Sequence, residues 1–143
     1  MREVFLSHAS QDQKPARWLR NLLLAHRVPV WYSEHHIGGA QQWQDEIGAA
    51  RRRCGWFMIL LTPHSVKSMW VKRELGYALI EKHYQNRIVP LHFRTCDAKA
   101  LSWTLPQFQW LDFRVDHRLA AENLLKIWRK RLREDCLRKL GRP

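Results

Sequence analysis

Residues 56–61 constrain the fold most strongly, because every side chain in this run is apolar. A run of this length is typical of a strand that is buried on both faces, as in a parallel sheet. Pro63 ends the run, and Ser65 or Ser68 can cap the helix that follows by accepting a free backbone N–H. The sequence therefore predicts a buried strand that is followed closely by a helix.

Strand and helix patterns alternate in the same way along the whole chain. The remaining predicted strands cover residues 4–6, 28–32, 88–93 and 109–113. The predicted helices begin near Pro15, Trp43, Ser68 and Arg118, and the last of them runs to about Leu140. Because the alternation repeats at short spacing, we predict an α/β fold with an open, parallel, five-stranded sheet and helices on both faces.

Composition narrows the class of protein. The chain has 143 residues, which is the size of one domain. It contains no apolar stretch of the roughly 18 residues that a membrane span needs, and its first residues lack the apolar region of a secretion signal. The three cysteines are far apart, and the adjacent His35 and His36 have no partner at metal-ligand spacing. We therefore expect a cytoplasmic domain without disulfides, a membrane span or a metal site.

The formal net charge of +12 is the one unusual bulk property. Much of it lies between residues 126 and 142, where basic side chains far outnumber acidic ones. This segment can be a solvated helix face, or it can bind an anionic partner such as nucleic acid. We favour the solvated face, because no nucleic-acid-binding motif and no stacked aromatic residues accompany the basic side chains.

Glu74 is the most promising chemical group in the sequence. It shares a helical stripe with Trp70 and Tyr77, which places a carboxylate beside an aromatic surface. In open α/β sheets, ligands bind at the carboxyl ends of the strands, close to where this helix begins. A carboxylate there can accept hydrogen bonds from sugar hydroxyls, stabilise an oxocarbenium ion or act as a general base. On the pattern alone we favour a helix-surface salt bridge, because WxxxE is a short motif.

Several segments, taken in order, resemble the conserved boxes of a TIR domain. They are the opening box, the second box with the loop after the second strand (the BB loop), the third strand, the WxxxE helix and the last strand. These segments lie at residues 4–12, 30–39, 56–62, 70–74 and 109–113, respectively. The match covers nearly the whole chain and is closer in style to bacterial TIR domains than to animal receptor adaptors. It implies a single flavodoxin-like TIR domain over residues 1–143, which can be the N-terminal part of a longer protein.

The resemblance to bacterial TIR enzymes implies an NAD+ glycohydrolase, which cleaves the bond between nicotinamide and ribose. Glu74 occupies the position of the catalytic glutamate. The residues that the resemblance places at the substrate are Ser7, His8, Ser33 and Trp70. Many TIR enzymes carry an acidic residue where this chain has Ser33, although Glu34 is adjacent. NAD+ is then the substrate, no cofactor is needed, and the product is ADP-ribose or a cyclic ADP-ribose.

The resemblance also implies activation by self-assembly, in which TIR domains pack head to tail and one BB loop closes the neighbour's site. The residues expected at this contact are Glu34, His35, His36, Ile37, Gly38, Gly39 and Trp43. An open contact of this kind extends into a filament. A covalently linked sensor domain can then trigger assembly in antiphage or cell-death signalling. The alternative is a non-catalytic TIR–TIR interaction module in which Glu74 is a structural residue.

Overall fold

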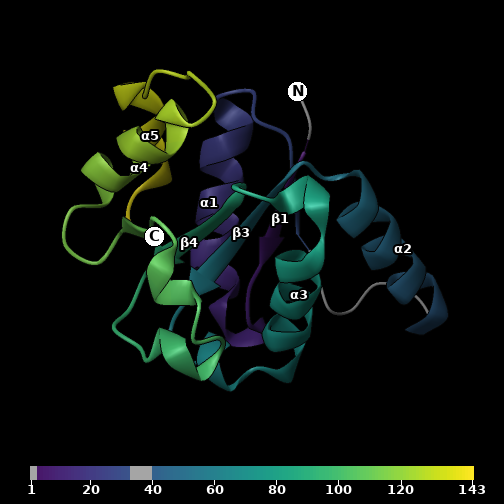
Figure 1. Cartoon of the computed structure of the whole chain (residues 1–143). Helices are drawn as coiled ribbons and strands as arrows, with labels where there is room; N and C mark the ends of the chain where they lie inside the picture. The colour runs from purple at the N-terminus through teal and green to yellow at the C-terminus, as the bar shows by residue number, and fades with distance from the viewer. Residues whose placement is uncertain (1–2, 33–39) are drawn as a thin grey trace.

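A five-stranded, entirely parallel sheet forms the centre of the computed structural model. Figure 1 shows the sheet between the helices. The structure describes residues 3–32 and 40–143, and the side chains of these residues other than 40–44. The strands are β1 (Val4–Ser7), β2 (Val30–Tyr32), β3 (Trp56–Leu61), β4 (Ile88–His92) and β5 (Leu111–Asp112). Their order across the sheet is β2-β1-β3-β4-β5. This order confirms the predicted flavodoxin-like fold, in which the chain changes direction across the sheet between β1 and β3.

Helices cover both faces of the sheet. They are α1 (Gln13–Ala25), α2 (Ala40–Arg53), α3 (Met69–Ile80), α4 (His117–Lys126) and α5 (Glu134–Leu140). Figure 1 shows α1, α4 and α5 on one side of the sheet and α2 and α3 on the other. Successive side chains of a strand point to opposite faces, so each strand contributes to both cores. In β3, for example, Met58 and Leu60 pack with the first group of helices, and Phe57 and Ile59 pack with the second.

The central strand and the helix after it form as the sequence predicts. Five of the six residues of β3 are fully buried, because the strand has neighbours on both sides and helices on both faces. Ser68, one of the two predicted caps, begins α3 by accepting a hydrogen bond from the backbone N–H of Val71 at 3.2 Å. The other candidate, Ser65, instead forms a turn with Thr62, whose N–H it accepts at 2.9 Å. The Thr62–Ser68 turn thus fixes where α3 leaves the sheet.

The prediction of one continuous helix from Arg118 to Leu140 is wrong. The helix α4 ends at Lys126, and Arg129 adopts a left-handed backbone conformation with φ 58°, which no continuous α-helix contains. The chain then turns back, so that α5 packs against α1 and Leu137 is buried in the same core as the residues of α1. The indole N–H of Trp18 donates to the carbonyl of Gly141 at 2.9 Å. Burial of a second apolar surface therefore outweighs continuation of the helix.

The predicted edge strands are also shorter in the structure. The strand expected at residues 109–113 reduces to Leu111–Asp112, and the one expected at 28–32 reduces to Val30–Tyr32. Arg27 has a positive φ of 62°, and the N–H of Val28 donates to the carbonyl of Leu23, so these residues form the turn that ends α1. Because of this turn, β2 begins at Val30 and not at Val28.

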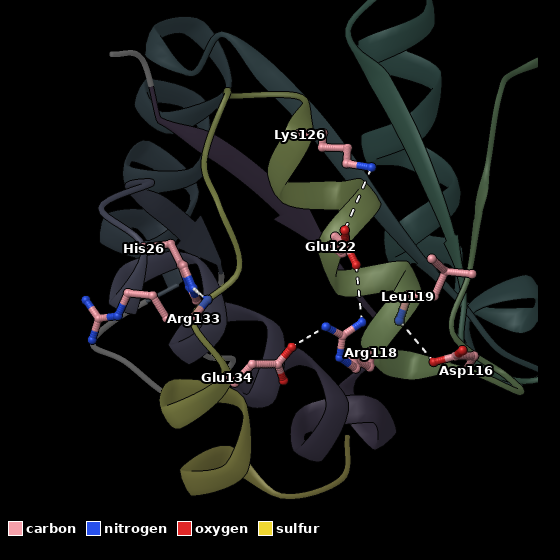
Figure 2. A network of polar contacts seen from close by, with 8 residues as sticks. All are labelled: His26, Asp116, Arg118, Leu119, Glu122, Lys126, Arg133 and Glu134. Carbon is pink, nitrogen blue, oxygen red and sulfur yellow. Dashed lines mark hydrogen bonds and ion pairs between the residues drawn. The ribbon is translucent and has the colours of Figure 1, made fainter.

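Polar contacts hold the returning C-terminal segment against the rest of the domain (Figure 2). The Nε2 atom of His26 accepts the backbone N–H of Arg133 at 3.0 Å, and its Nδ1 lies 2.8 Å from the carbonyl of Leu22. Because Nε2 accepts, Nδ1 carries the proton and donates to Leu22. Arg118 bridges Glu122 and Glu134 by ion pairs and so links α4 to α5. In the described part of the chain, no helix has the length and apolar character to cross a membrane.

Candidate active site

Glu74 is almost completely buried, which is unusual for a carboxyl group. It lies in the middle of α3, its exposed fraction is 2%, and its neighbours Leu75 and Val71 belong to the core beneath the helix. The hydroxyl of Ser7, the last residue of β1, donates to Oε1 of Glu74 at 2.6 Å. Oε2 is also buried and makes no hydrogen bond within the described residues. The short hydrogen bond from Ser7 is therefore the main contact that holds the carboxyl group.

Burial sets the protonation state of Glu74. Loss of hydration raises the pKa of this carboxyl from 4.5 to about 8, because the charged form loses more than the neutral form on leaving water. The Ser7 hydroxyl, the positive charge of Arg51 and the Trp70 side chain oppose this rise and lower the pKa, in that order of size. At neutral pH the free domain thus holds Glu74 largely protonated, in an environment that favours ionisation when further positive charge arrives.

A cavity of about 550 Å³ lies between α2 and α3 and reaches Glu74. Its described lining residues are Asp45, Ile47, Gly48, Arg51, Arg52, Trp70, Arg73 and Glu74. Trp70 is one helical turn before Glu74 and supplies an aromatic wall. The guanidinium groups of Arg51, Arg52 and Arg73 give the cavity a positive character, which suits an anionic ligand. The cavity therefore combines an acid, an aromatic surface and anion-binding groups.

Arg51, like Arg52 and Arg73, is a cavity residue that the sequence interpretation missed. Its guanidinium lies 4.5 Å from the centre of the Tyr77 ring, and its buried Nε has no hydrogen-bond acceptor within the described residues. The backbone carbonyl of Arg51 accepts the Tyr84 hydroxyl at 2.7 Å, which fixes the end of α2. Arg51 is four residues after the buried Ile47, so helical spacing already placed it on the inner face of α2. This helical spacing is the sequence feature from which Arg51 could have been predicted as a site residue.

The structure brings together three of the predicted site residues. Ser7 touches Glu74, and Trp70 and Glu74 both line the cavity. His8 is buried with its ring 5.4 Å from that of Tyr32, and it is not among the described residues that line the cavity. The roles of Ser7, His8, Trp70 and Glu74 toward a substrate stay predictions.

The other predicted site residues lie outside the described part of the structure. They are Ser33, Glu34, His35, His36, Ile37, Gly38 and Gly39. Trp43 is placed within α2, but its side chain is not described. Within residues 3–32 and 40–143, no group of three or more His, Cys, Asp or Glu side chains is arranged to hold a metal ion.

The sheet order and the buried acid at a cavity define the class: an open, parallel α/β domain of flavodoxin-like topology with a candidate site beside α3. The sequence model of the TIR domain matches residues 4–126, and the chain therefore belongs to the TIR domain family. This confirms the predicted family.

Comparison with solved structures gives the same fold. One similar structure is that of the TIR domains in the activated Roq1 resistosome directly recognizing the pathogen effector XopQ. The two chains share 13% sequence identity with a TM-score of 0.63, and the similarity covers 89% of this chain and 99% of that chain. At this identity the likeness shows the fold alone. No curated protein matches the sequence.

Proposed function

We propose that this TIR domain, like the bacterial NAD-cleaving type that its sequence resembles, cleaves NAD+ at the bond between nicotinamide and ribose. The observation that carries the proposal is the Glu74 carboxyl group, which is buried at a cavity and held by Ser7 through one oxygen. A strongly raised pKa at a cavity is typical of functional carboxyl groups. Membership of the TIR family supports the same reaction, because this family includes NAD+-cleaving enzymes.

In the proposed reaction, the nicotinamide ring of NAD+ enters beside Trp70 and brings its positive charge close to Glu74. This charge lowers the pKa of the carboxyl group, which ionises as the substrate binds. The C1′–N bond then breaks, and its electron pair moves to the ring nitrogen, so that nicotinamide leaves as a neutral molecule. No acid is needed for this leaving group. The ionised Glu74 stabilises the positive charge that develops on the ribose.

The second half of the reaction decides the product. Attack of water on the ribose cation gives ADP-ribose and releases one proton, whereas attack by a nitrogen of the substrate's own adenine gives a cyclic ADP-ribose. The guanidinium groups of Arg51, Arg52 and Arg73 offer counter-charges for the substrate's diphosphate in either case. NAD+ is consumed as a substrate, and the proposal requires no cofactor.

We extend the proposal to activation by self-assembly. The cavity lies beside α2, the helix that directly follows the BB loop segment of residues 33–39, so a neighbouring copy that packs there would complete it. The similar structure comes from the TIR domains of an activated resistosome, which is an assembly of that protein. In this proposal a linked sensor domain concentrates the cytoplasmic TIR domains, which pack head to tail and extend into a filament. NAD+ loss then serves antiphage or cell-death signalling.

The test measures nicotinamide release from NAD+ at low and high concentrations of the domain. We expect release per site to rise steeply with concentration, and Glu74→Gln to reduce it by at least about a hundredfold, because the variant cannot carry the negative charge. Glu122→Gln makes the same chemical change on the surface of α4 and is the matched control. Circular dichroism establishes that each variant is folded. Equal release by the Glu74→Gln variant would overturn the proposal.

A non-catalytic interaction module is the second candidate. The contact between Ser7 and Glu74 favours it, because a neutral carboxyl group in this position can act as a structural link between β1 and α3. This candidate predicts concentration-dependent self-association without nicotinamide release at any concentration. Light scattering and nicotinamide release, measured on the same samples, therefore separate the two functions.

A further inference from the structure

A second cavity, of about 650 Å³, lies where the fold itself favours a ligand. In an open α/β sheet with this strand order, ligands bind outside the carboxyl ends of the strands, at the point where the chain changes direction. That point lies between β1 and β3 in this domain. The second cavity is lined by Asp12, from the segment after β1, and by Thr62, which directly follows β3. None of its described lining residues belongs to the Glu74 cavity.

Basic side chains from separate segments converge on this second cavity. Lys14, Arg94, Arg114 and Arg142 all line it. Arg114 forms an ion pair with Asp112 at 2.8 Å, whereas the other three have no ion pair within the described residues. These charges come from α1, the segments after β4 and β5, and the end of the described chain. A doubly charged phosphate group would find several donors there.

An acidic and an aromatic group complete the lining of the second cavity. The Asp12 side chain is held in place because its Oδ2 accepts the Thr62 hydroxyl at 2.5 Å, and only 4% of the residue is exposed. A fixed carboxylate is the group that binds ribose hydroxyls in many nucleotide sites of related topology. Phe93 is half-buried and stacks on the buried Phe113, with ring centres 4.6 Å apart and planes 8° apart. Its ring offers an aromatic surface to a base.

We propose that the second cavity binds a nucleoside phosphate, independently of the Glu74 site. The phosphate lies among Lys14, Arg94 and Arg142, the ribose reaches Asp12, and the base lies against Phe93. A bare anion would use the basic groups alone. A nucleoside phosphate uses all three kinds of group, and this combination is what the cavity presents.

The test is calorimetric titration of the full chain with ADP, and with pyrophosphate as the bare anion. We expect ADP to bind at least about tenfold more tightly than pyrophosphate, since the ribose and base add contacts. Arg94→Gln with Arg142→Gln should weaken ADP binding by about a hundredfold, because each lost charge-assisted contact contributes about tenfold. Phe93→Leu should bring the affinities for ADP and pyrophosphate closer together.

Two control variants separate binding in this cavity from a general effect of positive charge and from binding in the Glu74 cavity. Arg131→Gln with Arg138→Gln removes the same charge from exposed positions outside the cavity, and should leave ADP affinity within about twofold at matched salt. Arg51→Gln with Arg73→Gln removes it from the Glu74 cavity and so abolishes any ADP binding to the groups proposed there for the diphosphate of NAD+; the ADP binding that depends on Arg94 and Arg142 should persist in this variant. Loss of ADP binding in either control, or equal affinity for ADP and pyrophosphate, would overturn the proposal. The titration requires no turnover, so its outcome does not depend on NAD+ cleavage.

Discussion

Two buried polar side chains, Glu74 and His26, illustrate opposite solutions to the same problem. Both are at most 5% exposed. His26 uses both ring nitrogens, one toward Leu22 and one toward Arg133, and so connects α1 to the C-terminal segment. Glu74 uses one oxygen toward Ser7 and leaves the other without a hydrogen bond in the described structure, at the wall of a cavity. A fully satisfied buried group stabilises the fold, whereas a half-satisfied one at a cavity is available to a ligand.

The largest expected effect is on the pH dependence of stability, through Glu74. Its pKa is about 8 in the folded state and close to 4.5 in the unfolded chain, so the folded state holds an extra proton between these values. The free energy of unfolding should therefore fall by a few kcal/mol as the pH rises from about 4.5 to about 8. Urea unfolding at a series of pH values measures this fall. In Glu74→Gln the fall should be absent, and a fall of equal size in the variant would contradict the assignment.

Removal of the His26 side chain should produce the next largest effect. His26→Ala leaves the Arg133 N–H without its acceptor, so the free energy of unfolding should decrease by about 1–3 kcal/mol. Chemical unfolding at neutral pH measures the decrease. Nicotinamide release per folded site should stay unchanged, because His26 is not among the described residues of the Glu74 cavity. If His26→Ala kept its stability but released less nicotinamide, His26 would have a catalytic and not a structural role, which would contradict the contrast with Glu74.

Ser7→Ala should produce a smaller change, seen in the pH profile of the reaction. The Ser7 hydroxyl is the largest of the contacts that lower the pKa of Glu74, so its removal raises that pKa further. The rise of kcat/KM with pH should move to higher pH by about one unit, which corresponds to a loss of about tenfold below the midpoint. Ser10→Ala is the control, because Ser10 lies three residues further along the chain and its hydroxyl donates to Gln11. An unshifted profile in Ser7→Ala would show that the hydroxyl does not act through the carboxyl group.

Arg51→Met should also move the pH profile of kcat/KM to higher pH, by less than Ser7→Ala does. Arg51 favours the ionised form of Glu74 through its charge, and this contribution is smaller than that of the Ser7 hydroxyl. Arg53→Met is the matched control, because Arg53 is two residues away and pairs with Glu3 at the surface. A larger shift of the pH profile in Arg53→Met than in Arg51→Met would contradict the role of the Arg51 charge in lowering the pKa of Glu74. Steady-state rates of nicotinamide release across pH measure both shifts.

Much of the fold could be predicted from local patterns. The apolar run of β3 and the Ser68 cap of α3 depend on residues close together in the chain, and both were predicted. The end of the helix before Arg129 was not predicted, because the basic residues around this position have good helix propensity. Only the packing of α5 on α1, a contact between distant segments, makes the turn favourable. Tertiary packing therefore overrode a local preference.

The candidate site was predicted in part for the same reason. The WxxxE spacing identified Trp70 and Glu74, but it suggested an exposed glutamate and not a buried one. The burial follows from Ser7 on β1 and Arg51 on α2, which approach α3 only in the folded domain. A sequence pattern shows which residues share a helix face. It does not show how deeply the neighbouring elements enclose that face.

The most direct test of the account is the titration of Glu74 itself, followed by NMR of its ¹³C-labelled carboxyl group in the free wild-type domain. Assignment is made by the signal that disappears in Glu74→Gln. The account predicts a midpoint of about 8, because the carboxyl group is enclosed and only partly compensated. A midpoint close to 4.5, the value of a glutamate in water, would contradict it, since such a group would lie in solvent and away from the cavity.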